Sequence, residues 1–282
     1  MPAARPGACP VSRRIRLDSE LVRRGLARSR EQAADLIVGG RVSVGGRTAA
    51  KPATQVDTAS PIVVAEAPEG PDYVSRGAHK LVGALDAFGP RGLEVPGRRC
   101  LDAGASTGGF TDVLLRRGAA HVLAVDVGYG QLAWSLRTDE RVTVMERVNV
   151  RDLTAEMVGD PPELIVGDLS FISLRLVLPA LAACAAAQAD LVMLVKPQFE
   201  VGKDRVGAGG VVRDPALRAG AVRDVAAAAG ALALAVRGVT ASPLPGPSGN
   251  VEYLIWLGKG PGPPGVGDLA TEIDRAVEEG PR

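Results

Sequence analysis

Residues 101–110 read LDAGASTGGF, a glycine-rich loop that indicates the class of fold. After a short apolar run, an aspartate and three glycines follow in close succession, and such loops let the backbone approach a ligand closely. Gly104 and Gly109 have the separation of a phosphate-binding P-loop, but Phe110 stands where that motif carries lysine. The dinucleotide motif G-x-G-x-x-G fits better, although Ser106 replaces the glycine that admits a pyrophosphate. The loop therefore favours a nucleoside ligand that carries no phosphate.

The sequence around this loop predicts a βαβ unit. Residues 98–104 indicate a strand that ends at Asp102, and apolar residues at helical spacing indicate a helix over 108–119. A second buried strand is expected over 121–127, with Asp126 near its end. In nucleotide-binding folds, a carboxylate at this position accepts hydrogen bonds from ribose hydroxyls. The alternative is that Asp126 only caps the turn that follows it.

The rest of the chain continues the alternation of strands and helices. Further strands are expected over 141–148, 163–171, 190–200, 235–244 and 250–258, and further helices over 77–89, 130–138, 173–187 and 214–230. Repeated alternation with apolar strands predicts an α/β fold, in which helices cover both faces of a mostly parallel sheet. Ligands of such sheets bind at the carboxyl ends of the strands.

The composition is ordinary for a globular protein of 282 residues, with 46% hydrophobic and 23% charged residues. Cys9, Cys100 and Cys184 are odd in number and lack C-x-x-C spacing, which argues against a disulfide framework and against a zinc site. No apolar run approaches the roughly 20 residues that span a bilayer. The first residues also lack the apolar core of a signal peptide. A reducing, cytoplasmic location is therefore expected.

The net charge of +1 hides an asymmetry between two parts of the chain. Residues 1–51 hold 11 Lys and Arg against 4 Asp and Glu, whereas the remainder holds 22 basic and 28 acidic residues. A basic segment attached to a mildly acidic one indicates that the first part binds a polyanion. Arginine dominates this segment, and its planar fork suits phosphate recognition. The candidate RNA-binding residues are Arg13, Arg14, Arg16, Arg23, Arg24, Arg28, Arg30 and Arg41.

The basic segment also has the pattern of a small domain. A short helix over 17–27 is followed by Ser29 and Gln32 in the spacing of a capping box, and then by a second helix. Two short strands around Gly45 and Gly46 come next. This order closely resembles the small RNA-binding domain named after ribosomal protein S-four, which implies contacts with structured RNA. The expected division of the chain is a disordered arm over 1–14, this domain over 15–70, a linker over 71–77 and a second domain over 78–282.

Four charged residues of the second domain are candidates for chemistry. Asp168 and Lys196 stand at the ends of two expected strands, Glu252 lies within the last strand, and Lys80 lies on the helix before the glycine loop. A lysine directly after the apolar run LVMLV is unusual, because lysine is rarely buried without a partner. Lys196 can act as a proton acceptor or can pair with Asp168 to hold the strand ends together. The spacing by itself leaves both interpretations open.

These four residues match, in order, the K-D-K-E tetrad of ribose 2′-O-methyltransferases of the FtsJ-like superfamily. With the motifs SRGAHKL, GDLSFISL, LVKPQFEVGK and SPLPGPSGNVEY, residues 15–280 resemble the haemolysin A/TlyA family, which joins the RNA-binding domain to such an enzyme. The resemblance implies a Rossmann-like methyltransferase with a mostly parallel seven-stranded sheet. It also implies S-adenosylmethionine as the methyl donor and the ribose of cytidine in 16S and 23S rRNA as the acceptor.

The resemblance assigns roles to individual residues. Lys196 accepts or steers the proton of the ribose hydroxyl, Lys80 holds the acceptor, and Asp168 and Glu252 orient the two ammonium groups. The implied cofactor-binding residues are Asp102, Gly104, Ala105, Ser106, Thr107, Gly108, Asp126, Val127 and Asn149, with Asp152 as the alternative to Asn149 at the adenine edge.

Other classes of function make different demands on the sequence. No metal is expected, because His79 and His121 lack the spacing of metal ligands. A membrane-active haemolysin would need a spanning or barrel pattern, and a nicotinamide enzyme would need the missing second glycine. A non-catalytic RNA-binding protein for ribosome assembly would not need the complete tetrad.

Overall fold

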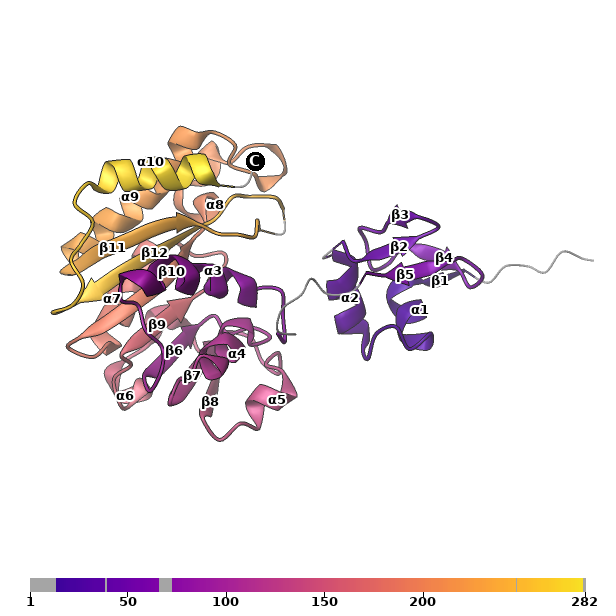
Figure 1. The fold of residues 1–282 in the computed structure, drawn as a ribbon, viewed down its shortest axis with the longest axis horizontal. Helices are drawn as coiled ribbons and strands as arrows, with labels where there is room; N and C mark the ends of the chain where they lie inside the picture. The colour runs from indigo at the N-terminus through magenta and orange to yellow at the C-terminus, as the bar shows by residue number, and fades with distance from the viewer. Residues whose placement is uncertain (1–13, 39, 66–72, 247, 281–282) are drawn as a thin grey trace, which may run out of the picture. The chain divides into compact units, whose positions relative to one another are not determined.

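The computed structural model describes residues 14–38, 40–65, 73–246 and 248–280, and it divides the chain into two compact units, Met1–Asp72 and Tyr73–Arg282 (Figure 1). Most of the predicted arm, including Arg13, lies outside the described residues, but Arg14 begins the first strand. Residues 73–77, expected to be a linker, make contacts within the second unit. The backbone N–H of Val74 donates to Asp112 Oδ2 at 2.9 Å, and Tyr73 packs against the core of that unit.

The first unit contains the two helices and the small strands that the sequence predicts. Its elements are β1 (Arg14–Arg16), α1 (Leu17–Arg23), α2 (Arg30–Val38), β2 (Val42–Val44), β3 (Arg47–Thr48), β4 (Gln55–Asp57) and β5 (Ile62–Val64). One sheet pairs β1 with β4, and the other has the order β3-β2-β5. One half of the predicted capping box forms, since Gln32 N–H donates to Ser29 Oγ at 3.1 Å, but the Gln32 side chain accepts from Arg28 N–H at 2.7 Å, one residue before the N-cap. Leu17, Leu21 and Ile37 fill the small core.

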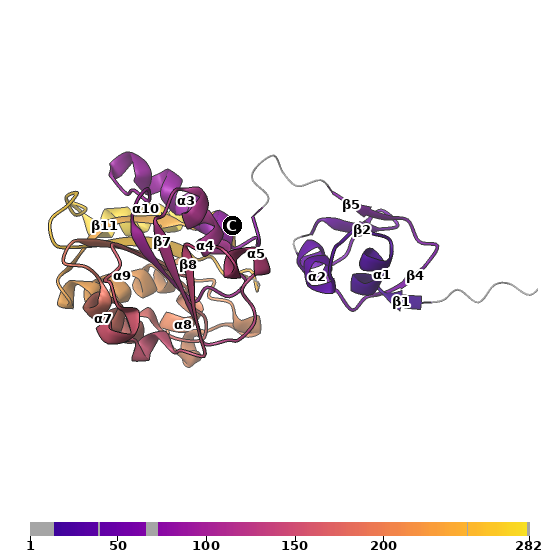
Figure 2. The same ribbon diagram turned by 90° about the horizontal axis from the view of Figure 1, so that it is seen from below.

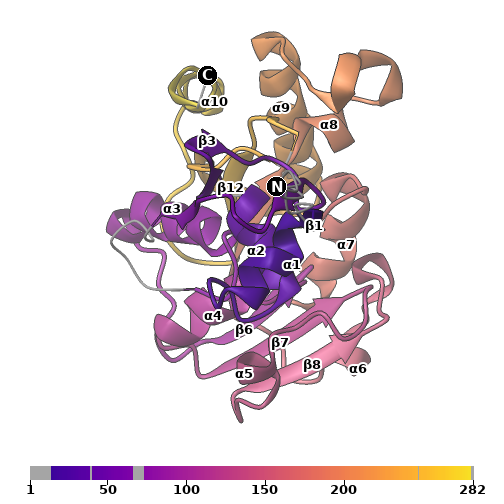
Figure 3. The same ribbon diagram turned by 90° about the vertical axis from the view of Figure 1, so that its right-hand side faces the viewer.

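The second unit is built on a seven-stranded sheet with the order β11-β12-β10-β9-β6-β7-β8. The pairs on either side of β12 are antiparallel and all the others are parallel. Figure 3 shows β6, β7 and β8 side by side. The strands are β6 (Arg99–Ala103), β7 (His121–Asp126), β8 (Val142–Glu146), β9 (Leu164–Gly167), β10 (Ala189–Val195), β11 (Leu234–Ala241) and β12 (Tyr253–Lys259). The predicted α/β class with a mostly parallel seven-stranded sheet is confirmed.

Helices cover both faces of this sheet (Figure 2). Alternate residues of β10 enter two different cores, with Leu191 and Met193 in one and Val192 and Leu194 in the other. Helices α3 and α4 pack on the second of these faces, and α7 and α9 pack on the first. The helices are α3 (Ala78–Phe88), α4 (Gly109–Arg116), α5 (Trp134–Arg137), α6 (Ala155–Val158), α7 (Leu174–Cys184), α8 (Pro197–Glu200), α9 (Pro215–Ala231) and α10 (Leu269–Glu279), and the 3-10 turns are η1 (Gly89–Arg91), η2 (Val150–Asp152), η3 (Lys203–Arg205) and η4 (Ala208–Gly210).

Several predicted elements are shorter in the structure than in the sequence analysis. The helix expected over 130–138 is reduced to α5, and the strands expected over 163–171 and 190–200 end at Gly167 and Val195. The strands stop where charged or polar side chains begin, since Asp168 and Lys196 are the next residues. Within the described part of the chain, no helix is both long and apolar enough to cross a membrane.

A buried charge cluster holds the start of β10. Asp190 Oδ1 accepts from Arg237 Nη1 and from Trp256 Nε1, each at 2.7 Å, and its Oδ2 accepts from Arg98 Nη1 at 2.6 Å. Arg237 lies on β11 and Trp256 on β12, so a single carboxylate ties three adjacent strands together. Buried charges are tolerated when they are paired and hydrogen-bonded in this way.

Asp190→Ala should therefore destabilise the protein strongly. The Arg237 side chain, only 3% exposed, would keep its buried charge without a carboxylate partner, a loss that costs about 3–5 kcal/mol in buried pairs. The control is Asp86→Ala, which breaks the exposed pair with Arg117 and should cost about 0–1 kcal/mol. Urea unfolding followed by circular dichroism compares the two variants, and equal losses would contradict a structural role of the Asp190 cluster.

Candidate active site

Strand pairing brings three of the four candidate catalytic residues to one edge of the sheet. Asp168 directly follows β9 and Lys196 directly follows β10, and these two strands are parallel neighbours. Glu252 directly precedes β12, whose first residue, Tyr253, pairs with Val195 in antiparallel register. Lys80 reaches the same place from the first turn of α3. The carboxyl ends of β9 and β10 and the amino end of β12 therefore meet at this edge.

The four side chains form a continuous chain of ion pairs. Lys196 Nζ lies 2.6 Å from Asp168 Oδ1, and Lys80 Nζ lies 3.4 Å from Asp168 Oδ2 and 2.7 Å from Glu252 Oε2. Lys80, Lys196 and Glu252 are buried, whereas the Asp168 side chain is 22% exposed. The pair between Lys196 and Asp168 that would hold the strand ends together is present. It is part of a larger alternating array of two ammonium groups and two carboxylates.

Two further residues extend this chain at its ends. Ser170 Oγ accepts a hydrogen bond from Lys196 Nζ at 2.8 Å, and Gln198 Nε2 donates to Glu252 Oε1 at 3.4 Å. The sequence analysis did not select either residue. The available signal was position, because each stands two residues beyond a tetrad member, Asp168 or Lys196, in the segment after a strand.

A cavity of about 520 Å³ adjoins this chain of ion pairs. Its volume lies in the range of small-molecule and cofactor sites, roughly 300–1,000 Å³. Five of the predicted cofactor-binding residues line it, together with Asp168, and these five are Gly104, Ser106, Asp126, Val127 and Asn149. Asp152, the alternative to Asn149, is not among the lining residues. Residues that the sequence analysis missed also line it, namely Gln131, Val148, Val150, Leu169, Ser170, Phe171, Ile172 and Val177.

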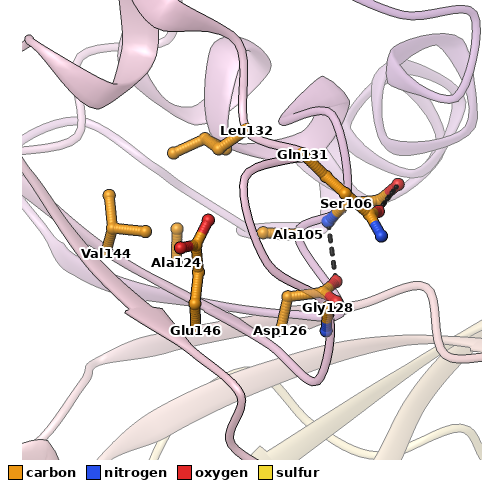
Figure 4. Close-up of a pocket in the computed structure, with 9 residues that line it drawn as sticks. All are labelled: Ala105, Ser106, Ala124, Asp126, Gly128, Gln131, Leu132, Val144 and Glu146. Carbon is orange, nitrogen blue, oxygen red and sulfur yellow. Dashed lines mark hydrogen bonds between the residues drawn. The ribbon is translucent and has the colours of Figure 1, made fainter.

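Four predicted cofactor-binding residues, Asp102, Ala105, Thr107 and Gly108, do not line this cavity. Ala105 faces a neighbouring pocket of about 10 Å³, which Figure 4 shows with Ser106, Asp126 and Gln131. The backbone of Thr107 accepts from Ala133 N–H at 3.1 Å. Gly108 has no room for a side chain because Leu132 and Leu136 lie against it. These residues therefore contribute to the conformation of the loop and not to the wall of the larger cavity.

Asp126 already makes two hydrogen bonds to the backbone. Its Oδ2 accepts from Ser106 N–H at 2.8 Å, the contact drawn in Figure 4, and its Oδ1 accepts from Gly128 N–H at 2.6 Å. The turn-capping alternative is thus correct as a description of contacts. A carboxylate oxygen has two lone pairs, so the same side chain retains acceptor capacity toward the cavity that it lines.

Gly104 lets the glycine loop approach the end of β9. Its φ is +85°, and a Cβ at this position would lie 2.9 Å from the backbone carbonyl oxygen of Asp168. Residues other than glycine rarely adopt such φ values. The glycine therefore brings the loop after β6 directly against the residue that carries the central carboxylate of the tetrad.

Asp102 is fully buried beneath the loop. Its Oδ2 accepts from Thr111 Oγ1 at 2.7 Å, while its Oδ1 has no hydrogen-bond partner among the described residues. Burial raises the pKa of the Asp102 carboxyl to about 7, against the hydrogen bonds from Thr111, and the carboxylates of Asp168 and Asp126 add to the increase. A buried carboxylate with a free oxygen can bind a cationic or hydrogen-bonding group of a ligand.

The first unit presents a different kind of site, a set of arginines around two buried acids. Arg23 and Arg24 both donate to Glu20, and the hydrogen bond from Arg23 lowers the pKa of the Glu20 carboxyl to about 2 in spite of burial. Arg16 and Arg30 similarly contact Asp18. Glu20 and Asp18 therefore hold the side chains of these four arginines in place around α1.

These arginines differ in how much of the guanidinium remains available. Arg24 also donates to the backbone carbonyl oxygens of Ser60 at 2.9 Å and Thr58 at 2.7 Å, so most of its donors are used inside the unit. Arg41 likewise donates to the carbonyl oxygen of Ala65. The Arg23 side chain is 56% exposed.

Among the described residues, no group of His, Cys, Asp and Glu side chains is arranged to hold a metal ion.

Each unit is similar to proteins of known families. Residues 73–259 match the FtsJ-like methyltransferase family, and residues 15–60 match the S4 domain. The 16S/23S rRNA (cytidine-2'-O)-methyltransferase TlyA of Mycobacterium tuberculosis is 60% identical over 281 residues, covering 96% of this chain and 100% of that protein. Hemolysin A of Brachyspira hyodysenteriae is 38% identical and covers 85% of this chain and 98% of its own. The solved structure of a protein named as a hemolysin from Streptococcus thermophilus is 39% identical, with a TM-score of 0.74, and covers 94% of this chain and 95% of that chain.

Replacement of the buried Asp102 carboxyl should change how stability depends on pH. With a pKa of about 7 in the folded state and 3.8 as its ordinary value, the folded protein binds the extra proton, so this group lowers stability as the pH rises from about 4 to about 7. In Asp102→Asn that loss disappears, and the urea midpoint of the variant relative to the wild type should rise over this interval. The control, Asp139→Asn, should show no such rise between pH 4 and 7, because Arg141 lowers the pKa of Asp139 and its contribution to stability changes only below the ordinary value of 3.8. A difference for Asp102→Asn that does not vary with pH would contradict the raised pKa.

Proposed function

Because the chain belongs to the FtsJ-like methyltransferase family, we propose that it transfers a methyl group from S-adenosylmethionine to the ribose 2′-hydroxyl of cytidine in 16S and 23S rRNA. The family resemblance drawn from the motifs is confirmed by the match over residues 73–259 and by the full-length relative. The observation that carries the proposal is the chain of ion pairs from Lys196 to Glu252 beside the cavity.

The cavity residues fit a nucleoside donor with a positive charge. When bound, S-adenosylmethionine supplies a methyl group on a sulfonium, which needs no metal and no phosphate site. Asp126 would accept the ribose hydroxyls and Asn149 would face the adenine, whereas the buried Asp102 would support the methionine-side loop from beneath. Ser106 stands where a pyrophosphate would need glycine, and it lines the cavity without hindering such a donor.

The tetrad would prepare the acceptor hydroxyl for attack. A 2′-hydroxyl becomes a good nucleophile only when its proton has an acceptor. Lys196 would take or steer this proton, because it is the lysine that also contacts Ser170 at the cavity wall. Asp168 holds both lysines, and Glu252 holds Lys80 from the other side, so the two cationic groups keep a fixed separation. Fixed placement of reacting groups supplies much of the rate enhancement in such transfers.

The first unit would supply affinity for the RNA. The S4 domain match, the basic segment and the exposed guanidinium groups all fit a phosphate backbone as the partner. An rRNA acceptor would place the protein in the cytoplasm, where ribosomal subunits are assembled. Relatives named as hemolysins suggest membrane activity as an alternative, but that function would leave the ion-pair chain beside the cavity without a role.

Lys196→Ala should abolish methyl transfer while affinity for S-adenosylmethionine and for RNA stays near that of the wild type, because the lysine acts in the transition state. Lys196→Arg should be nearly as inactive, since arginine keeps the charge but does not release its proton. The matched control is Lys259→Arg, which changes a lysine bound to the carbonyl oxygens of Ala182 and Ala185.

Mass-spectrometric mapping of ribose methylation on isolated ribosomal subunits, with calorimetry of donor binding, measures these effects. High activity of Lys196→Arg would make Lys196 an electrostatic anchor for the acceptor instead of a base. Absence of 2′-O-methylation by the wild type on both subunits would refute the proposed function.

Arg23→Ala and Arg24→Ala should separate RNA binding from folding, although both residues contact Glu20. Loss of the exposed Arg23 should weaken binding to ribosomal subunits and reduce the salt slope by about 1. Loss of Arg24 should instead destabilise the first unit, because its contacts to Ser60 and Thr58 disappear. Binding measured over a range of salt concentrations, together with thermal unfolding, tests the pair. The assignment is wrong if Arg23→Ala unfolds the unit and leaves the salt slope unchanged.

A further inference from the structure

Ser170 lies at the point where the ion-pair chain reaches the cavity. It stands two residues after Asp168, its Oγ accepts from Lys196 Nζ at 2.8 Å, and it lines the cavity wall. The residue is exposed, whereas the Lys196 side chain is 8% exposed. The other group that contacts Lys196 Nζ, the Asp168 side chain, is 22% exposed. Ser170 is therefore the more accessible of the two.

The two contacts of Lys196 fix the direction of its nitrogen. A protonated lysine has three N–H donors. Ser170 Oγ accepts one of them at 2.8 Å, and Asp168 Oδ1 lies 2.6 Å from the nitrogen as its ion-pair partner. Because Nζ is tetrahedral and is bonded to Cε, a directed hydrogen bond to Ser170 fixes the rotation about the Cε–Nζ bond. The directions of the remaining positions of the nitrogen are then fixed as well.

The hydrogen bond to Ser170 survives a change in the protonation state of Lys196. An ammonium has three N–H donors, and an amine keeps two of them beside one lone pair. Ser170 Oγ can therefore accept from Lys196 Nζ in both states, which leaves another position of the nitrogen to carry the lone pair in the amine and the transferred proton in the ammonium.

The loop that carries Ser170 is clamped to the segment that carries Lys196. The rings of Phe171 and Phe199 lie 5.2 Å apart between their centroids, and Phe199 belongs to α8, which begins directly after Lys196. Glu200 on the same helix accepts from Ser173 Oγ at 2.5 Å and from Leu174 N–H at 2.7 Å. Phe171 has a φ of +63°, which non-glycine residues adopt only when the surroundings hold them there. Contacts on both sides of the Ser170–Lys196 hydrogen bond thus fix the two segments together.

We propose that Ser170 is a positioning residue that aims the third position of Lys196 Nζ at the ribose 2′-oxygen and holds the nitrogen there in both protonation states. This inference rests on the proposed function. In the reaction, the bond from the 2′-oxygen to the methyl carbon forms, the carbon–sulfur bond breaks, and the hydroxyl proton moves to Lys196 Nζ. Ser170 gains and loses no atom in this sequence.

The first test observes Lys196 without any substrate. The ¹³Cε resonance of Lys196, assigned through its loss in Lys196→Ala, is followed against pH in the full-length protein. Ser170→Ala should change this pH dependence, and Ser170→Thr, which keeps a hydroxyl, should restore it. Thr271→Ala is the control, because it removes a hydroxyl that donates to Asp268 at the start of α10 and takes no part in the contacts around Lys196. It should leave the Lys196 resonance as in the wild type.

The second test measures single-turnover methyl transfer to ribosomal subunits at a saturating concentration of S-adenosylmethionine. Ser170→Ala should slow transfer by roughly 10- to 100-fold, as expected for a misplaced catalytic group, and should shift the pH–rate profile. Donor affinity should not change, and Ser170→Thr should stay within a few-fold of the wild type. In a Lys196→Ala background, Ser170→Ala should add no further loss, since a residue that acts through Lys196 has nothing left to position.

The inference is overturned if Ser170→Ala has the rate and pH profile of the wild type, or if Ser170→Thr is as slow as Ser170→Ala. An unchanged Lys196 resonance in Ser170→Ala would also overturn it, even if Lys196→Ala proves too slow for the double-variant comparison. A wild-type protein that methylates no rRNA ribose would refute the proposed function instead. The resonance experiment would still report the hydrogen bond in that case, so the two failures can be told apart.

Discussion

The pairing of β10 with β9 on one side and β12 on the other is the constraint on which the active site depends. Parallel pairing places the end of β9 beside the end of β10, and antiparallel pairing in the register Val195 to Tyr253 places the start of β12 there as well. Asp168 directly follows β9, Lys196 directly follows β10, and Glu252 directly precedes β12. A shift of one residue in the register would turn each side chain to the opposite face of the sheet. The backbone hydrogen bonds thus set the separation of the charges before any side chain interacts.

The two ends of β10 show what burial demands of charge. The strand itself is apolar and buried throughout, with a carboxylate near its start and an ammonium directly after its end. At the start, Arg237, Trp256 and Arg98 take both oxygens of Asp190, and the cluster is closed. At the other end, the carboxylate that the two lysines share is partly exposed and lines a cavity. Both arrays satisfy the requirement that buried charges be paired, but only the one beside the cavity can also act on a ligand.

The first unit applies the same requirement to arginine. Glu20 and Asp18 are buried, which is tolerable because arginines bind them. The acids in turn hold these long side chains in place and reduce the entropy lost when a phosphate is bound. Arg24 and Arg23 are neighbours with one shared partner. The contacts to the β4–β5 connection occupy the guanidinium of Arg24 within the unit, whereas the Arg23 side chain is 56% exposed.

The sequence alone determined the α/β alternation and the two-part organisation, and it predicted a glycine loop for a ligand without phosphate and, through the family motifs, the tetrad. These features are local, because hydrophobic period, turn residues and motif spacing are properties of short segments. Only the tertiary structure showed that Ser170 and Gln198 extend the tetrad, that Asp102 is buried beneath the loop, and that Ala105, Thr107 and Gly108 do not line the cavity. It also showed that Asn149 lines this cavity and Asp152 does not. Those distinctions depend on which side chains meet across residues far apart in the chain, such as Ser170 and Lys196, and strand register and packing decide that meeting, not the local pattern on either segment.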